Sequence, residues 1–579
     1  MRSFNIRIGG EAGQGLVSIG NILLEAIARE GWYLFANQDY ESRIRGGHNF
    51  FQIRLADEPV RAIQKGIDLL VALDKRTVPL YWEELTQAGH VIYDPKVSDT
   101  LPEELQGSGR AIPVSFEEIV EELNLPKVMA NAAAAGAVWA LLSDEITVLH
   151  QILAEMFISK GEEVVEGNRR VSQAGFDTVR KIIGTDIPRP AKPKERRPRM
   201  LLKGNEALPL GALAAGVRFM SAYPMTPSTG VTEFIAAHAE ECGVVMEQAE
   251  DEISAINMVI GAAYTGVRAM TATSGGGFAL MTEGLGLAGA AEIPVVVIDA
   301  QRPGPSTGLP TRTEQGDLLF AVAASSGDFP KAILSPGDPE EAFYLMGQAF
   351  NLAEEYQMPV IVMSDQHLAD SHMIVDVLDL SRIEHRRGLV VFGEDAGPDY
   401  KRYRLTEYGI SPRLYPGFGP GLVVSAGDEH DEAGHLTEDA EMRRLMMEKR
   451  MAKMKRVQEE ALDPVLFGTE EEPDAVLMGW GSTKGAIRET VEFLNQGTCK
   501  VLGVHLPQVY PLPKSLQKIL EGPGRKFIVE SNFTGQLERL IASEFAWKPD
   551  GSIRRYDGRP IDPDYILSKL RGGLCRGHK

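Results

Sequence analysis

The sequence predicts an α/β protein made of several parallel-sheet domains, and three observations lead to this class. Short apolar segments alternate with helical ones through most of the 579 residues. Glycine-rich turns follow two of the predicted strands, at residues 9–15 and 274–277. The predicted strands 267–273 and 294–300 are largely apolar, which is typical of parallel strands that helices cover on both faces.

The first block contains a strand at 4–8, a tight turn at 9–15 and an amphipathic helix at 16–30 that ends at Gly31. This βα unit opens an α/β domain that we expect to span residues 1–184. Residues 184–198 contain four prolines and repeated positive charge, which neither a helix nor a sheet accommodates. We therefore predict a linker at 185–200.

The second block, residues 201–375, repeats the βαβ pattern. It contains predicted strands at 244–248, 267–273, 294–300 and 359–363 and predicted helices at 253–265 and 278–291. An irregular connecting region follows at 376–470 and becomes helical at 439–462. Methionines in that helix recur at helical spacing, and we expect them to pack against neighbouring protein. The last block, 471–579, has predicted strands at 475–478, 501–505 and 527–530.

Charge and hydropathy limit the classes of partner. The formal net charge of −21 and the pI near 5.1 argue against nucleic acid or an anionic membrane as the main partner. No apolar run approaches the roughly 20 residues that a spanning helix needs. The first residues enter a strand and turn and lack a signal-peptide pattern, so we expect a cytoplasmic protein.

The three cysteines, Cys242, Cys499 and Cys575, lie far apart and show no C-x-x-C spacing. One copy therefore cannot supply the four thiolates of an iron–sulfur cluster. If the protein uses such a cluster, we expect another chain to carry it.

The most specific motif is Tyr223-Pro224-Met225-Thr226-Pro227-Ser228-Thr229. It resembles the YPITPST signature of 2-oxoacid:ferredoxin oxidoreductases, which use thiamine diphosphate (TPP). The resemblance covers nearly the whole chain and is strongest to the 2-oxoglutarate type. It implies an alpha subunit with a gamma-type domain fused in front, a TPP pyrimidine-binding domain and a transketolase-C-like domain.

The resemblance also implies the reaction. A 2-oxoacid, here 2-oxoglutarate, loses CO₂ and passes electrons to ferredoxin, while coenzyme A (CoA) takes the acyl group as succinyl-CoA. The reaction is reversible and can fix CO₂.

TPP is activated by a carboxyl group beside its pyrimidine ring, and that carboxyl group needs an apolar setting that raises its pKa. Glu247, Glu250 and Glu252 are the candidates. Comparison with the family favours Glu252, because a helix rich in small residues follows it. The alternative makes all three ordinary acidic residues near a helix start.

Further site residues follow from the same resemblance. Tyr223, Pro224 and Thr226 are expected at the cofactor, and Thr226 is held between two prolines near a strand end. Arg302 is expected to face the 2-oxo carboxylate, because a guanidinium suits bidentate binding. Arg312 is the candidate contact for a distal carboxylate.

The turn containing Gly10, Gly13 and Gly15 departs from the dinucleotide-binding spacing, because residue 18 is serine. Nicotinamide binding is therefore disfavoured. Glycine-rich turns that open helices can hold phosphate, and the family associates this domain with CoA. Arg45, in an Arg-Gly-Gly segment, is a further candidate for binding CoA.

The sequence contains no Gly-Asp-Gly, the motif that binds Mg²⁺ and diphosphate in TPP enzymes. The resemblance therefore implies a beta subunit that carries this motif, Mg²⁺ and a [4Fe-4S] cluster, in an (alpha-beta)₂ assembly that reduces ferredoxin. We assign no metal ligand in this chain and expect the acidic run at 427–432 to be a polar loop.

Three alternatives stay open. The substrate could be pyruvate or a branched-chain 2-oxoacid, since pocket shape cannot be derived from one sequence. A transketolase or non-oxidative decarboxylase is disfavoured, because it should carry its own Gly-Asp-Gly domain and this sequence has none. A non-catalytic subunit that binds CoA or a nucleotide would show no dependence on TPP.

Overall fold

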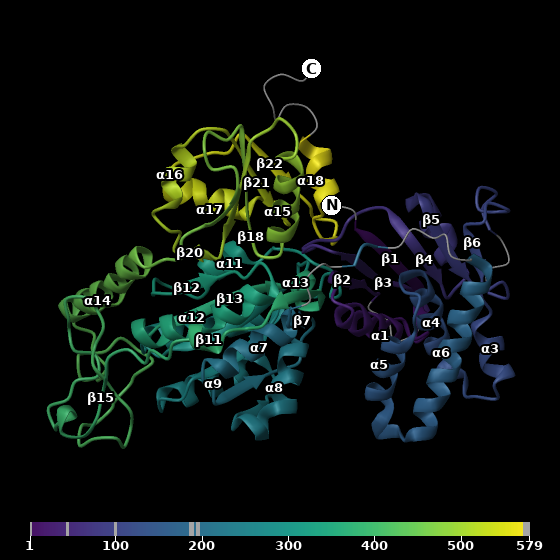
Figure 1. The fold of residues 1–579 in the computed structure, drawn as a ribbon. Coiled ribbons are helices and arrows are strands. Elements are labelled where there is room, and N and C mark those ends of the chain that lie inside the picture. Colours follow the sequence, from purple (N-terminus) through teal and green to yellow (C-terminus); the bar gives the residue numbers. More distant parts are fainter. Residues whose placement is uncertain (1–2, 42–45, 98–100, 184–189, 193–196, 571–579) are drawn as a thin grey trace. The chain divides into compact units, whose positions relative to one another are not determined.

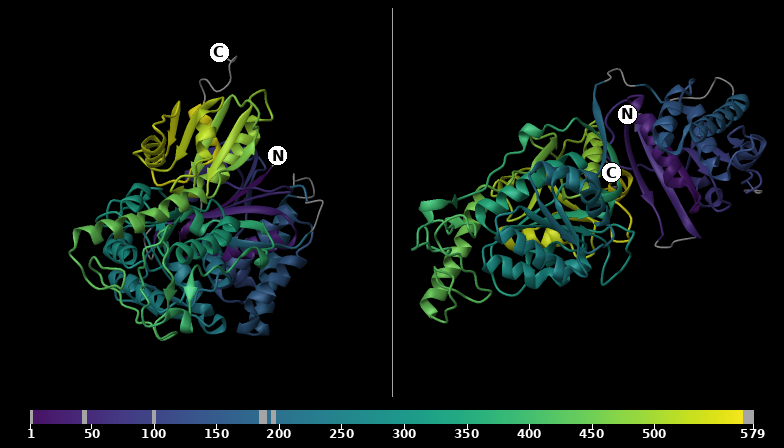
Figure 2. Two further views of the ribbon diagram at one scale, coloured as in Figure 1. Left: turned by 90° about the vertical axis from the view of Figure 1, so that its left-hand side faces the viewer. Right: turned by 90° about the horizontal axis from the view of Figure 1, so that it is seen from below.

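The computed structural model describes residues 3–41, 46–97, 101–183, 190–192 and 197–570. The chain divides into two units, each considered by itself. Unit 1 comprises Met1–Leu202 and Ser371–Val377, and unit 2 comprises Lys203–Asp370 and Leu378–Lys579. Unit 1 is drawn mainly in purple and blue, and unit 2 in teal, green and yellow (Figures 1 and 2). Most of the predicted linker at 185–200 lies outside the described residues.

Unit 1 is built on an eight-stranded mixed sheet in the order β6-β5-β4-β1-β3-β2-β14-β7. Strands β1, β4, β5 and β6 run parallel, whereas β3 is antiparallel to both β1 and β2. The strands are β1 (Phe4–Ala12), β2 (Tyr33–Asp39), β3 (Gly46–Ala56), β4 (Ile67–Ala72), β5 (Leu85–Tyr93), β6 (Ala111–Pro113), β7 (Arg199–Lys203) and β14 (His372–Asp376). Strand β14 comes from far along the chain and pairs with β2.

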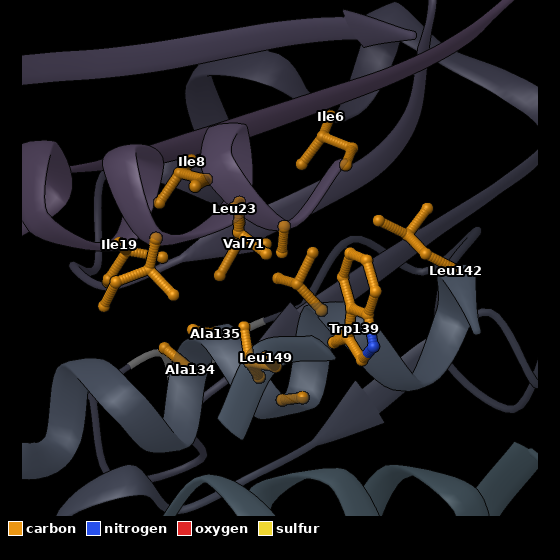
Figure 3. Packing of buried hydrophobic residues seen from close by; sticks show 14 of the residues in the cluster. Ile6, Ile8, Ile19, Leu23, Val71, Ala134, Ala135, Trp139, Leu142 and Leu149 are labelled. Atoms are coloured by element: carbon orange, nitrogen blue, oxygen red, sulfur yellow. The ribbon is translucent and has the colours of Figure 1, made fainter. Parts of the chain in front are cut away.

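Helices cover this sheet and close its core. They are α1 (Leu16–Arg29), α2 (Thr77–Tyr81), α3 (Phe116–Glu122), α4 (Ala130–Leu142), α5 (Thr147–Phe157) and α6 (Glu162–Ile183). Figure 3 shows Ile6 and Ile8 of β1 facing Leu23 of α1 and Trp139 of α4. Gly136 lets α4 approach α6, because a Cβ there would lie 2.0 Å from the Ser172 carbonyl oxygen.

The central sheet of unit 2 has seven strands in the order β20-β12-β13-β11-β10-β8-β9, of which only the edge strand β20 is antiparallel in the described pairings. The strands are β8 (Phe219–Ala222), β9 (Val245–Gln248), β10 (Ala269–Thr273), β11 (Val295–Gln301), β12 (Ala332–Leu334), β13 (Pro359–Asp365) and β20 (Gln508–Tyr510). The helices between them are α7 (Gly204–Ala214), α8 (Thr229–Cys242), α9 (Glu252–Tyr264), α10 (Gly275–Ala290), α11 (Leu318–Val322), α12 (Pro339–Tyr356) and α13 (Gln366–Asp370).

Helices cover both faces of this sheet, as the apolar strands predicted. Val295 and Val297 of β11 pack with residues of α9 and α10, whereas Val296 and Ile298 pack with residues of α7 and α12. The predicted strands and helices of this block are confirmed to within about three residues at each end.

The C-terminal part of unit 2 has a five-stranded sheet in the order β17-β19-β18-β21-β22. Its elements are β17 (Val465–Gly468), β18 (Ala475–Trp480), α15 (Thr483–Leu494), β19 (Val501–Leu506), α16 (Leu516–Glu521), β21 (Arg525–Glu530), α17 (Gln536–Phe545), β22 (Gly551–Arg554) and α18 (Pro563–Leu570). Strands β19, β18, β21 and β22 are parallel. The three predicted strands of this block are confirmed.

The connecting region carries the short strands β15 (Val390–Val391) and β16 (Arg413–Leu414) and the long helix α14 (Ala440–Glu459). In both figures this region extends outward from one end of unit 2 (Figures 1 and 2). The helix was predicted, but its buried face is mainly cationic. Lys449, Arg450 and Lys453 are buried with Met446, whereas the other methionines of the stripe are only partly buried.

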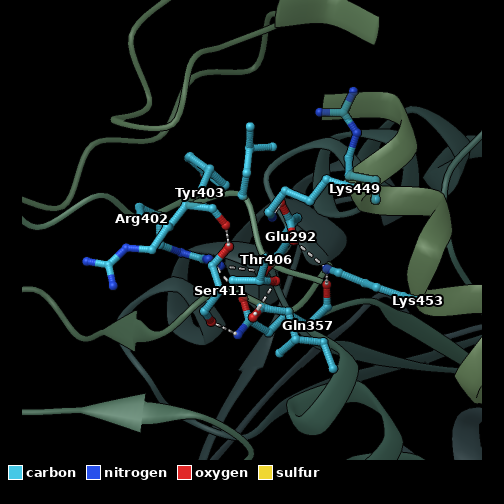
Figure 4. Close-up of polar contacts among 12 residues, drawn as sticks. Glu292, Gln357, Arg402, Tyr403, Thr406, Ser411, Lys449 and Lys453 are labelled. Atoms are coloured by element: carbon cyan, nitrogen blue, oxygen red, sulfur yellow. Dashed lines mark hydrogen bonds and ion pairs between the residues drawn. The ribbon is translucent and has the colours of Figure 1, made fainter. Parts of the chain in front are cut away.

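The buried cations of α14 surround one carboxylate. Lys449 and Lys453 both form ion pairs with Glu292, which follows α10 and is fully buried (Figure 4). Arg402 donates to the Glu292 carbonyl oxygen at 2.7 Å and to Gln357 Oε1 at 2.8 Å. Burial lowers the pKa of Lys453 to about 7. Burial opposes ionisation of Glu292 as well, but the two lysine charges outweigh it and hold its pKa below the usual range.

Candidate active site

The predicted TPP residues gather at the carboxyl edge of the seven-stranded sheet, where α/β sheets commonly bind ligands. Strand β8 ends at Ala222 and leads into Tyr223 and Pro224. Strand β9 leads to Glu252, β10 to the glycine run 275–277, and β11 to Arg302. Because these strands are parallel, their following loops meet at one edge.

Glu252 is the first residue of α9 and is 3% exposed, whereas Glu247 and Glu250 are exposed. Asp251 caps this helix by accepting a 2.7 Å hydrogen bond from the Ser254 amide, so Glu252 is not needed as the cap. Its Oε1 is buried and has no hydrogen-bond partner among the described residues. A buried carboxyl oxygen without a donor is costly, and such a group suits a ligand that brings the donor.

The glycine run at the start of α10 makes room for this carboxyl group. A Cβ on Gly277 would lie 2.5 Å from Glu252 Oε1 and 2.2 Å from Thr273 Oγ1. Ser274 is the N-cap residue, and its buried hydroxyl forms no hydrogen bond within the described part of the chain. Only glycine allows the backbone of α10 to approach Glu252 this closely.

Thr226 and Arg302, predicted from separate motifs, are in direct contact. Arg302 Nη1 donates to the Thr226 carbonyl oxygen at 2.6 Å, so the guanidinium meets the backbone of the motif. The loop is held by Asn205 Nδ2, which donates to the Pro227 carbonyl oxygen at 2.9 Å. Burial lowers the pKa of Arg302, and the neighbouring Asp317 opposes that shift. Arg302 Nε is buried and unpaired among the described groups.

Sequence reasoning missed two carboxyl groups that lie close to each other, and one of them, that of Asp317, is also near this arginine. Asp299 lies on the same face of β11 as Val297, is fully buried, and neither of its oxygens has a partner among the described residues. Asp317 begins α11 as its N-cap. A Cβ on Gly275 would lie 2.5 Å from Asp317 Oδ2, so the same glycine run separates Asp317 from Glu252.

Burial raises the pKa of both aspartates. The pKa of Asp317 rises to about 6, and that of Asp299 rises well above its usual range because the Asp317 carboxylate adds to burial. Burial also raises the pKa of Glu314, on the same loop, to about 7. A polar residue at the end of a buried strand was the available signal for Asp299, whereas Asp317 resembles an ordinary helix cap in the sequence.

Arg312 lies on the same loop, on the side of the C-terminal sheet. A Cβ on Gly558 would lie 3.0 Å from Arg312 Cβ, and the Thr313 amide donates to the Gly558 carbonyl oxygen at 3.3 Å. The role of Arg312 towards a distal carboxylate stays a prediction.

The predicted CoA turn lies in unit 1. Gly13 and Gly15 have left-handed φ values of 93° and 80°, and Gly15 is the N-cap of α1. A side chain on Gly15 would collide with Asn131, whereas a Cβ on Gly13 would meet nothing within 4 Å. Gly10 belongs to β1, and a Cβ there would lie 2.7 Å from Gln14 Oε1. Arg45 lies outside the described residues.

Two family models match the chain. Residues 210–449 match "Pyruvate flavodoxin/ferredoxin oxidoreductase, thiamine diP-bdg", and residues 5–178 match "Pyruvate ferredoxin/flavodoxin oxidoreductase". The 2-oxoacid:ferredoxin oxidoreductase subunit alpha of Saccharolobus solfataricus is 33% identical, over 99% of this chain and 98% of that protein. The chain belongs to the alpha subunits of the 2-oxoacid:ferredoxin oxidoreductases.

Other relatives agree with this placement. The KorA subunit of the Mycobacterium tuberculosis 2-oxoglutarate oxidoreductase is 29% identical to this alpha subunit, over 98% of this chain and 91% of that protein. A solved structure of 2-oxoglutarate:ferredoxin oxidoreductase from Magnetococcus marinus, with 2-oxoglutarate, coenzyme A and succinyl-CoA bound, is 32% identical. It superposes with a TM-score of 0.93 over 99% of this chain and all of that chain.

Membership settles several predictions. The α/β fold class is confirmed, this alpha subunit is part of a TPP-dependent oxidoreductase, and the match to the TPP-binding family model spans residues 210–449. Relatives are named as subunits, so the chain works in a complex with other subunits. No helix within the described ranges is long and apolar enough to cross a membrane.

Proposed function

We propose that the enzyme to which this alpha subunit belongs catalyses the reversible oxidative decarboxylation of 2-oxoglutarate with CoA, giving succinyl-CoA, CO₂ and reduced ferredoxin. Its membership of the family carries the reaction class. The choice of 2-oxoglutarate is supported by the full-length similarity to the Magnetococcus marinus enzyme and to the KorA subunit of the Mycobacterium tuberculosis enzyme.

The buried carboxyl group of Glu252 is the observation that carries the cofactor assignment. When bound, TPP supplies the carbon nucleophile that adds to the 2-oxo carbon and lets CO₂ leave. Glu252 fits the pyrimidine of TPP, because its unpaired Oε1 can share a proton with a ring nitrogen in an apolar setting. Tyr223, Pro224 and Thr226 would border the same ring.

Arg302 is assigned to the 2-oxo carboxylate. One guanidinium nitrogen is held by the Thr226 carbonyl oxygen, which fixes the direction of the fork and leaves other donors for the substrate. The half-buried Asp317 places a carboxyl group near the guanidinium and balances its charge. Arg312 is assigned to the distal carboxylate of 2-oxoglutarate.

The remaining parts of the enzyme are assigned to a partner and to unit 1. A beta subunit would supply Gly-Asp-Gly, Mg²⁺ and the [4Fe-4S] cluster, and the complex would be (alpha-beta)₂ with ferredoxin as electron acceptor. We assign residues 1–184, with the turn at Gly10, Gly13 and Gly15 and with Arg45, to CoA. Residues 201–375, 376–470 and 471–579 remain our division of the other domains.

Reconstitution with the proposed beta subunit tests the proposal. The complex should reduce ferredoxin only when 2-oxoglutarate, CoA and TPP are all present, and this chain alone should turn over no 2-oxoacid. Glu252→Gln should abolish exchange of the TPP C2 proton in the complex, whereas the matched Glu250→Gln should leave it near wild type. Activity that persists in the Glu252 variant and disappears in the Glu250 variant would refute the assignment.

A further inference from the structure

The carboxyl edge of the C-terminal sheet is filled by a loop from the TPP-binding domain. Strand β18 is flanked by β19 on one side and by β21 on the other, so the chain connections diverge between β18 and β21. In α/β sheets the crevice at such a point is the usual ligand site. Here the side chain of Gln315, which is fully buried, enters between the ends of these two strands.

Gln315 is anchored by both its side chain and its backbone. Its Nε2 donates to the Trp480 carbonyl oxygen at 2.8 Å, and its Oε1 accepts from the Ser531 amide at 2.9 Å. Its amide donates to the Ser531 carbonyl oxygen at 2.7 Å, and its carbonyl oxygen accepts from Asn532 Nδ2 at 3.0 Å. Gly481 makes room for it, because a Cβ there would lie 2.7 Å from Gln315 Nε2.

A second glutamine holds the next residues of the loop. Gln536 Nε2 donates to the Gly316 carbonyl oxygen at 2.6 Å, and its Oε1 accepts from the Leu319 amide at 2.9 Å. Between these anchors, the Asp317 amide donates to Gln301 Oε1 at 3.1 Å. Gln301 directly precedes Arg302, so the anchors fix both ends of the loop 302–317.

We propose that Gln315 is a positioning residue, through which the C-terminal domain holds the loop 302–317 and so fixes Arg302 for the 2-oxoacid. This rests on the proposed function, in which Arg302 faces the substrate carboxylate. Without the hydrogen bonds of Gln315, the C-terminal sheet no longer holds the end of the loop that carries Asp317. Arg302, at the other end of the loop, then loses its fixed position. Misplacement of a substrate-binding group by about 1 Å is enough to cost up to about 10²-fold.

Two glutamine variants test the inference in the reconstituted complex. Gln315→Ala removes two side-chain hydrogen bonds. Gln508→Ala is the matched control, because Gln508, in the edge strand β20, is also buried and also makes two side-chain hydrogen bonds. Its Nε2 donates to the Pro511 carbonyl oxygen at 3.1 Å, and its Oε1 accepts from the Leu462 amide at 3.2 Å. Both variants should lower the melting temperature. Only Gln315→Ala should raise the KM for 2-oxoglutarate, by about tenfold or more, and kcat should fall much less.

Hydrogen exchange on the separate chain gives a readout that needs no substrate. Peptides covering 302–317 should exchange faster in Gln315→Ala than in Gln508→Ala. Equal exchange and equal KM values in the two variants would overturn the inference. If Gln315→Ala does not assemble, Gln536→Ala decides, since an unchanged KM in that variant also overturns it. A wild-type complex that turns over no 2-oxoacid would instead refute the proposed function, and with it the substrate role of the loop.

Discussion

Replacement of Gly277 by alanine is expected to disable the cofactor site while leaving α10 intact. Gly277 lies in the first turn of α10 at a helical φ, so alanine fits the backbone and should even gain about 1 kcal/mol of helix propensity. The added Cβ, however, would lie 2.5 Å from Glu252 Oε1, whereas an ordinary contact begins at 3.4 Å. The carboxyl group must therefore retreat by about 0.9 Å.

Glu252 has little space into which to move, because it is 3% exposed and the Cβ also approaches Thr273 Oγ1 at 2.2 Å. Overpacking of this kind typically costs about 1–3 kcal/mol of stability. A displacement near 1 Å at a catalytic group can reduce the rate by about 10². We therefore expect exchange of the TPP C2 proton to slow by about two orders of magnitude.

The neighbouring glycine provides the control. A Cβ on Gly276 would meet nothing within 4 Å, so Gly276→Ala carries the same propensity gain without the collision. The assay is C2 proton exchange followed by NMR in the reconstituted complex, with melting temperatures of both variants. If Gly277→Ala exchanges as fast as Gly276→Ala, the carboxyl group of Glu252 is not the one that activates the cofactor, or it does not require this position.

Three further predictions concern charged side chains. Glu292→Gln leaves Lys449 and Lys453 buried without a counter-charge and should cost about 3–5 kcal/mol, whereas Lys453→Met, which keeps one balanced pair, should lower the melting temperature much less. The pKa of Asp317 rises from 3.8 in the unfolded chain to about 6 in the folded protein, so the folded state binds the proton more tightly. The stability of the wild-type protein should therefore fall as the pH rises from about 4 to about 6. Asp317→Asn should remove this loss of stability, which is worth up to about 3 kcal/mol. The variant should therefore have a higher melting temperature than wild type at pH 8 but not at pH 4. Arg312→Ala should raise the KM for 2-oxoglutarate far more than that for pyruvate, and Arg302→Ala should raise both; equal effects of Arg312→Ala on the two substrates would place the distal-carboxylate site elsewhere.

The fold was predictable where signals are local. The βα units between residues 244 and 301 could be derived because apolar runs and glycine stops such as Gly266 define each element. Strand β14 could not, because nothing within its five residues indicates pairing with β2, more than 300 positions earlier. The sequence of α14 predicted packing through its methionines, and only Glu292, 157 residues before Lys449, explains why its lysines are buried as well.

The candidate site, like the fold, was predictable only where the signal is local in the sequence. The motif and the strand ends predicted Thr226 and Arg302 as site residues. Their contact could not be predicted, because Arg302 donates to the backbone carbonyl oxygen of Thr226 and the sequence pattern concerns side chains only. Spacing alone could not separate Glu252 from Glu247 and Glu250, because the difference lies in packing against Gly277. Asp299 and Asp317 are 18 residues apart and become neighbours only when the loop folds back over the sheet edge.

Helix α10 lies between the proposed cofactor site at its first turn and the ion pairs of α14 just beyond its last turn. Its first turn packs against the carboxyl groups of Glu252 and Asp317. Glu292, two residues beyond its last residue, forms ion pairs with lysines of α14. Sixteen residues of helix span about 24 Å, and a helix transmits a shift along its axis with little compression. The connecting region thus holds the far end of the helix whose first turn borders the cofactor site. Substitutions in α14 can therefore alter turnover without touching any reacting group, and a search for activity-changing variants should extend to that helix.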